Sequence, residues 1–287
     1  MSAEPTSSAP PRGATVPLIQ AQLHARLLNL AKQSDPALAK ADRILSASSS
    51  LDLNLMTAQY ALVFVAESIT AVHNRRVLLK VYTQLSSLVK YFSGFTLVAA
   101  DVAVPPPSVA VRMRALSSLI SDVRIFHRLW GLIGLLRWAI ATLQAPPKDA
   151  VLKAVAFTQV VSNIIYQPLE NIAYLGSHGI IPFSKAKINR LWVVSSRLWA
   201  AHVILEFVRL ARVKYLAKKD VSEQSGEKVT DGHTADTLWR RQLIVNAAYF
   251  PLTIHWSLET GLLTDLAVGA LGTIAGGARL VPLWKQQ

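Results

Sequence analysis

Basic side chains between residues 73 and 95 are spaced so that they share one side of a helix. That side carries Arg75, Arg76, Lys80 and Lys90, and no acidic residue interrupts it. The opposite side is apolar over an arc of about 140°, and its members include Val77, Val81, Leu85, Leu88 and Phe92. Because anionic headgroups attract the first side and acyl chains accept the second, the segment predicts a helix that lies in one leaflet of a membrane. An ordinary core-facing helix with a solvated basic side has the same pattern, so that interpretation stays open.

Signatures of enzyme chemistry are missing from the sequence. The seven histidines are scattered, and none stands in an HExxH or comparable pair of metal ligands. The chain has no cysteine, so it offers neither a thiolate metal site nor a disulfide. Glycine-rich phosphate loops, dinucleotide fingerprints and nucleophile elbows do not occur either. We therefore expect a protein that is not an enzyme and that has no catalytic residue, cofactor or bound metal.

A second group of basic and aromatic residues lies in the middle of the chain. Arg124 and Arg128 are one helical turn apart, and we expect them at a solvated or lipid-facing edge. Trp130 and Trp138 suit the aromatic belt of a membrane interface. Packing between helices is the role we favour for both tryptophans, because buried aromatic rings are common in helical cores.

Three positions read as helix boundaries. Pro168 is expected to break a helix, and Glu170-Asn171 just after it would suit a helix start, where a carboxylate favours the positive end of the helix dipole. Asp52 could cap a helix over Leu53–His73. At most a short turn around His73-Asn74 would then lead into the amphipathic segment.

Composition points to a membrane and to an anionic partner. Of the 287 residues, 52% are hydrophobic and only 16% are charged, whereas charged residues supply about a quarter of a typical soluble domain. The mean hydropathy is +0.33 and the net charge is +13. Since no nucleic-acid-binding signature is present, phospholipid headgroups are a better partner for this charge than nucleic acid.

The order of segments predicts an all-α, membrane-associated helical bundle with amphipathic helices and an apolar C-terminal helical hairpin or span. We expect a disordered Pro/Ser-rich N-terminus and a triple-proline linker between two helical regions, because three consecutive prolines continue neither helix nor central strand. The expected boundaries are 1–17 for that N-terminus, 18–104 for the N-terminal helical region, 105–108 for the linker, 109–219 for the central helical region, 220–236 for a polar loop and 237–287 for a membrane-embedded segment.

The C-terminal region is the most membrane-like part of the sequence. Between residues 242 and 278 only Glu259 and Asp265 are charged, and we expect both to be wet in a loop between two helices. Gly272 and Gly276 have the spacing of a GxxxG motif, which lets two helices approach closely in lipid. A glycine-rich hairpin turn would explain these glycines nearly as well.

Four ordered blocks, at residues 73–95, 122–138, 166–175 and 196–199, together resemble the peroxin-11 family of peroxisomal membrane elongation and division factors. Asp122–Trp138 (DVRIFHRLWGLIGLLRW) is similar to the central motif of that family. Tyr166–Asn171 (YQPLEN) followed by Tyr174-Leu175 resembles its "P-x-E-N…Y-L" block, and Ser196–Trp199 (SRLW) resembles its later Ser-x-x-Trp segment. His73–Phe95 stands where the family has its membrane-remodelling helix. The proline-rich N-terminus and the triple proline depart from the simplest pattern and suggest a divergent fungal branch.

The resemblance implies a peroxisomal membrane protein that elongates the membrane and promotes peroxisome proliferation and fission. It also implies membrane lipids as ligands, homo-oligomers, and recruitment of a fission adaptor and a dynamin-like GTPase. A membrane channel or pore for small metabolites is the alternative, because a C-terminal hairpin with Glu259 and Asp265 could line a path. A soluble helical scaffold that binds an acidic partner is a third possibility.

Overall fold

The computed structural model describes the backbone of residues 35–93, 105–223 and 232–285, together with residues 22, 26 and 33. Side chains are described over the same ranges, except for residues 77, 78, 80–93, 220–223 and 232–234. Most of these residues are helical and none lies in a strand, which confirms the expected all-α class. The chain divides into a unit Met1–Leu51 with Gln287, helical over 35–46, and a larger compact unit Asp52–Gln286.

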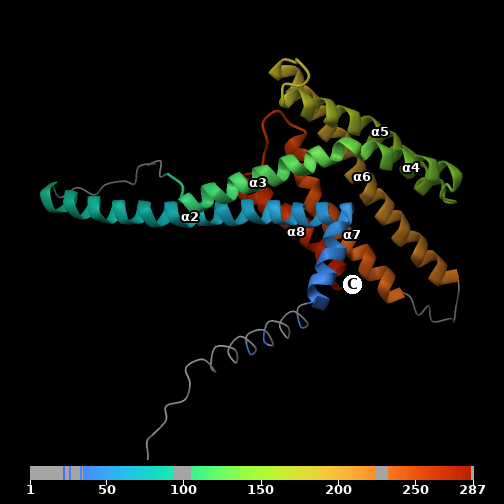
Figure 1. Cartoon of the computed structure of the whole chain (residues 1–287), viewed down its shortest axis with the longest axis horizontal. Helices are drawn as coiled ribbons and strands as arrows, with labels where there is room; N and C mark the ends of the chain where they lie inside the picture. Colours follow the sequence, from blue (N-terminus) through green and yellow to red (C-terminus); the bar gives the residue numbers. More distant parts are fainter. Residues whose placement is uncertain are drawn as a thin grey trace, which may run out of the picture. The chain divides into compact units, whose positions relative to one another are not determined.

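Long helices make up nearly all of the described chain (Figure 1). They are α2 (Ser48–Ser93), α3 (Ser108–His127), the 3₁₀ turn η1 (Arg128–Trp130), α4 (Gly131–Gln144), α5 (Ala150–Ser177), α6 (Lys185–Glu223), α7 (Gly232–Trp256) and α8 (Asp265–Lys285). Polar and turn-forming residues set several of the ends. The Asp149 carboxylate caps α5 by accepting a hydrogen bond from the Leu152 amide at 3.0 Å, and Asp265 places an acid in the first turn of α8.

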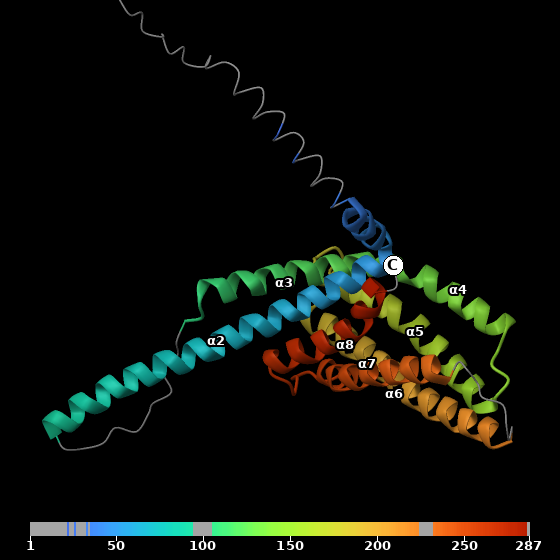
Figure 2. The same cartoon turned by 90° about the horizontal axis from the view of Figure 1, so that it is seen from below.

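Six helices of the larger unit follow one another around a ring in antiparallel pairs. α3 runs beside the first part of α2 (Figures 1 and 2), and the Ser117 hydroxyl donates to the Gln59 carbonyl at 3.0 Å. α8 packs on α2 and on α7, α7 packs on α6, and α6 packs on α5. The Arg128–Glu170 ion pair at 2.9 Å joins the turn η1, directly after α3, to α5 and closes the ring.

Glycines let α8 approach α2 closely. A Cβ atom added at Gly269 would lie 2.5 Å from the Phe64 backbone nitrogen, and one added at Gly276 would lie 2.5 Å from the Thr57 hydroxyl. Gly272 faces the Tyr60 ring at even closer range. We call Gly269, Gly272 and Gly276 the glycine seam.

Three of the described helical stretches are long and apolar enough to cross a membrane. They are Ser48–Arg76, Lys185–Lys219 and Asp265–Lys285, judged by length and composition. The end of α7 and the start of α8 are separated by a turn at residues 257–264, so the C-terminal region forms a helical hairpin. Glu259 lies exposed in that turn.

The structure corrects three expectations about helix boundaries. Pro168 lies inside α5 and does not end it, so Glu170-Asn171 is in the middle of a 28-residue helix instead of at a helix start. Asp52 is also inside a helix, because α2 begins at Ser48. No turn interrupts α2 at His73-Asn74, since the helix is continuous for 46 residues.

Candidate functional site

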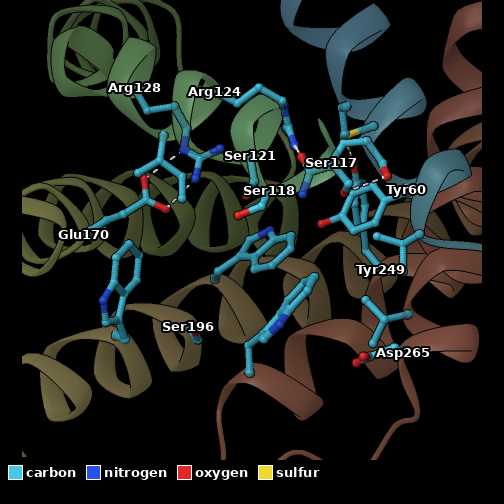
Figure 3. A pocket seen from close by; sticks show the side chains of 18 of the residues that line it. Tyr60, Ser117, Ser118, Ser121, Arg124, Arg128, Glu170, Ser196, Tyr249 and Asp265 are labelled. Atoms are coloured by element: carbon cyan, nitrogen blue, oxygen red, sulfur yellow. Dashed lines mark hydrogen bonds and ion pairs between the residues drawn. The ribbon is translucent and has the colours of Figure 1, made fainter. Parts of the chain in front are cut away.

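A cavity of about 670 Å³, lined by both polar and apolar side chains, lies at the centre of the ring (Figure 3). All six helices of the ring contribute to its wall. Polar lining residues include Gln59, Ser117, Ser118, Ser121, Arg124, Arg128, Glu170, Ser195 and Ser196, and aromatic ones include Tyr60, Tyr166, Trp192, Trp199, Tyr249 and Trp256. This volume is within the range of about 300–1,000 Å³ that is usual for small-molecule sites.

Arg124 fixes α3 to α2 at the cavity wall. Its Nε atom donates to Asp52 at 2.9 Å, and its Nη1 atom donates to the Gln59 side chain at 2.7 Å. Only 9% of the Arg124 side chain is exposed. The expectation of a solvated or lipid-facing edge is therefore wrong for this residue, because its charge is satisfied by partners inside the protein.

Arg128 forms the second ion pair of the wall. Its guanidinium donates two parallel hydrogen bonds of 2.9 Å to the carboxylate of Glu170, whose side chain is only 7% exposed. The Tyr166 hydroxyl donates to the same carboxylate at 2.6 Å. Burial, reinforced by the negative charge of Glu170, raises the pKa of Tyr166, so the phenol stays protonated and remains a donor. Arg128 likewise does not lie at a lipid-facing edge.

Two side chains of α5 stabilise the helix break at η1 by hydrogen bonds to backbone carbonyls. The Gln167 amide donates to the Arg128 carbonyl at 2.9 Å, and the Asn171 amide donates to the Leu129 carbonyl at 3.1 Å. These carbonyls lie at the 3₁₀ turn, where the helical ladder changes register. Gln167 can come this close because Gly131 has no side chain, since a Cβ atom there would lie 2.8 Å from the Gln167 oxygen.

Three of the sequence blocks singled out above therefore meet in space. Side chains of the block Tyr166–Asn171 form hydrogen bonds with Arg128 and Leu129, which belong to the block Asp122–Trp138. Further along, the Tyr174 hydroxyl donates to Asp122 at 3.0 Å. The third block, Ser196–Trp199, adds two wall residues, and the Trp199 ring stacks on Trp256 with centroids 5.6 Å apart.

The two tryptophans of the central block have different surroundings. Trp130 is 59% exposed and has the Phe126 ring as an edge contact at 5.5 Å. Trp138 is partly buried, and its ring meets His202 of α6 edge-on at 6.4 Å.

The expected membrane-binding residues all lie in the second part of α2. Arg75 and Arg76 are exposed, and the helix continues through them without a break. The side chains of Val77, Lys80, Val81, Leu85, Leu88, Lys90 and Phe92 lie outside the described residues, although their backbone is helical. The described contacts of α2 with α3 and α8 involve residues between Asp52 and Glu67, ahead of this segment. Gly272 and Gly276, the expected helix-packing residues, lie in the glycine seam against α2.

The cavity wall was not found by reading the sequence, although a signal for it exists. Ser117, Ser121, Arg124 and Arg128 recur at intervals of three or four residues, which places them on one face of a helix. The opposite face carries Leu116, Leu119 and Val123, which are all exposed. Among the described residues, no group of histidine and acidic side chains could hold a metal ion.

Comparison with known proteins gives one family. The model described as "Peroxisomal biogenesis factor 11 (PEX11)" matches residues 84–284. The uncharacterized protein C1F12.04c of Schizosaccharomyces pombe is 30% identical over 184 residues, which are 63% of this chain and 82% of the yeast protein. This fungal relative is consistent with a divergent fungal branch. No solved structure matches the chain.

The matched residues include the central block, the YQPLEN block, the glycine seam and the second half of the amphipathic segment. They cover more than half of the chain. The chain therefore belongs to the peroxisomal biogenesis factor 11 family, and it is a peroxisomal membrane protein that acts in peroxisome biogenesis.

Proposed function

We propose that this protein elongates the peroxisomal membrane and promotes proliferation and fission by inserting the second part of α2 into the cytosolic leaflet. The observation that carries the proposal is the continuity of α2. One uninterrupted helix passes from a part held against α3 and α8 into a segment with a basic side and an apolar side. The bundle thus carries the amphipathic segment as a direct continuation of one of its own helices.

Two physical terms favour binding of this segment to lipid. Arg75, Arg76, Lys80 and Lys90 each gain about 1 kcal/mol near an anionic surface. Burial of the apolar side adds about 1.5–3 kcal/mol for each large side chain that leaves water. Since the amphipathic segment enters only one leaflet, it acts as a wedge that expands this leaflet and favours positive membrane curvature.

Concentration of such wedges would convert a sphere into a tube, so the proposal includes homo-oligomers. The family resemblance supports this step, and it also supports recruitment of a fission adaptor and a dynamin-like GTPase to the elongated membrane. Cross-linking of the reconstituted protein, followed by size analysis in denaturing gels, would detect the oligomers.

The test compares two matched double variants of the full chain in liposomes that contain anionic lipid. Leu85→Gln with Leu88→Gln changes the apolar side, and Thr83→Gln with Ser87→Gln changes the polar side without adding charge. We expect the wild type and the polar-side variant to elongate the liposomes, and the apolar-side variant to leave them spherical in electron micrographs. Equal elongation by both variants would contradict insertion of this helix.

A further inference from the structure

The larger unit buries several polar groups and exposes many large apolar side chains. Buried polar residues include Ser117, Arg124, Gln159, Glu170, Ser195 and Asn246. Along α3 and α4 exposed apolar side chains recur at regular intervals: Leu116, Leu119, Val123, Phe126, Trp130, Ile133, Leu136, Ile140 and Leu143. Arg112, Arg114, His127 and Arg137 are exposed on the same helices. A continuous row of exposed large apolar side chains suits a bilayer better than water.

The cavity therefore lies in a bundle that lipid surrounds. Three of its walls come from the stretches that are long and apolar enough to cross a membrane, through residues such as Tyr60, Trp199 and Val268. Three hydroxyls of the wall, those of Ser118, Ser121 and Ser196, have no hydrogen-bond partner among the described residues, and a polar occupant would supply one.

The balance of charges in the cavity wall indicates which kind of ligand it could bind. Three arginines line the cavity, and each is paired with an acid: Arg114 with Glu67 and Asp265, Arg124 with Asp52, and Arg128 with Glu170. A purely anionic ligand would meet carboxylates, and a purely cationic ligand would meet guanidinium groups. A ligand with both charges and no net charge fits such a balanced wall.

The remaining wall residues suit the two charged parts of a zwitterion. Trp199 and Trp256 are stacked, with Trp192 as a third indole ring of the wall. Indole faces attract ammonium groups, and quaternary ammonium is commonly bound in such aromatic surroundings. Serine hydroxyls from α3 and α6 can donate hydrogen bonds to phosphate oxygens.

The cavity opens to the outside between α3 and the start of α8. Among the lining residues, Arg114, Ser118 and Asp265 are the exposed ones. The Arg114–Asp265 contact of 3.3 Å crosses this opening. A ligand could therefore place its polar part inside while an attached apolar part stays outside.

We propose that the cavity binds a phosphate–ammonium zwitterion, such as the headgroup of phosphatidylcholine or free phosphocholine. This site is separate from the amphipathic part of α2, so the proposal does not rest on leaflet insertion. A chain that fails to elongate liposomes could still bind the zwitterion, and the two failures are distinguishable.

The first experiment counts bound lipid on the full chain by native mass spectrometry, after incubation with equal amounts of phosphatidylcholine and phosphatidylglycerol. Ser121→Phe fills the cavity from α3, and no hydrogen bond to a described residue is lost with the Ser121 hydroxyl. Ala115→Phe adds the same ring on the exposed side of the same helix. We expect the wild type and Ala115→Phe to retain phosphatidylcholine and Ser121→Phe to retain at least tenfold less. Equal retention of the two lipids by the wild type, or of phosphatidylcholine by the two variants, would overturn the proposal.

A gentler variant covers the case in which Ser121→Phe does not fold. The chain has no cysteine, so Ser121→Cys creates a single thiol in the cavity, and Ala115→Cys is its control outside. N-ethylmaleimide should label the first thiol at least fivefold more slowly in short-chain phosphatidylcholine than in short-chain phosphatidylglycerol, with no difference for the control. Protection by free phosphocholine as well assigns the site to the zwitterion itself, and protection by the lipid alone assigns it to the headgroup in place. No protection by either compound refutes the proposal.

Discussion

At the scale of single residues, the Arg128–Glu170 pair shows how much the interior depends on matched charges. Removing one partner leaves the other charge buried without compensation. We expect Glu170→Gln to lower the free energy of unfolding by about 3 kcal/mol, measured by denaturant titration in mild detergent. Tyr166→Phe removes only one donor to the carboxylate and should cost about 1–2 kcal/mol.

The control for this prediction removes both charges together. Arg128→Leu with Glu170→Leu leaves no unpaired ion, so we expect it to be more stable than Glu170→Gln alone. If the double variant were the less stable protein, the pair would contribute through its own attraction, and the argument from an uncompensated charge would be wrong.

Residue roles were the hardest part to predict from sequence. Glu170 follows a proline, and that local pattern favours a cap. Its actual partner, Arg128, is 42 positions away, and no local rule connects the two. The basic segment around Arg75 was recognisable because its pattern is local, since both of its sides can be read at helical spacing.

At the scale of helices, the glycine seam sets the distance between α8 and α2. Gly269 faces the Phe64 backbone, which cannot rotate away as a side chain can. We expect Gly269→Ala to push the helices apart and to cost about 1–3 kcal/mol of unfolding free energy. Thermal unfolding in detergent would show this as a lower midpoint.

Gly277 provides the matched control on the same helix. A Cβ atom at Gly277 would meet nothing within 4 Å, and alanine favours helix over glycine by about 1 kcal/mol. Gly277→Ala should therefore be neutral or stabilising. Destabilisation of the same size at both positions would indicate a general intolerance of α8 and not a close helix contact.

The extent of the helices was predicted better than their ends. The all-α class and the C-terminal hairpin both follow from apolar periodicity and from turn residues. Pro168 was expected to end a helix, yet α5 continues for nine residues beyond it to Ser177. Packing of α5 against α6 outweighs the cost of about 3 kcal/mol for one proline inside a helix, and such packing is not visible in a single sequence.

At the scale of the whole molecule, the exterior of α3 and α4 tests whether lipid surrounds the larger unit. Leu119 is 60% exposed, and Leu262, in the turn between α7 and α8, is 72% exposed. In water a glutamate at either position would change stability by no more than about 0.5 kcal/mol. In hydrocarbon a charged residue costs about 2.5–3.5 kcal/mol.

We therefore expect Leu119→Glu to lower the free energy of unfolding in lipid bicelles by about 3 kcal/mol, with Leu262→Glu close to the wild type. If neither substitution changed the free energy of unfolding, α3 would lie in water. The main reason for a polar occupant of the cavity would then be removed.

The continuity of α2 has a mechanical consequence. A helix whose first part crosses a bilayer and whose second part rests on the surface must form an elbow between them. The amide oxygen of Asn74 is buried without a hydrogen-bond partner among the described residues, which marks this position as the joint we predict. Spin labels on Ala58→Cys and Ser87→Cys should be about 44 Å apart on a straight rod and about 31 Å apart after a right-angled fold. A shorter distance between the labels upon addition of anionic vesicles would show that α2 bends at Asn74 when its second part binds the membrane. An unchanged distance would show that α2 stays straight.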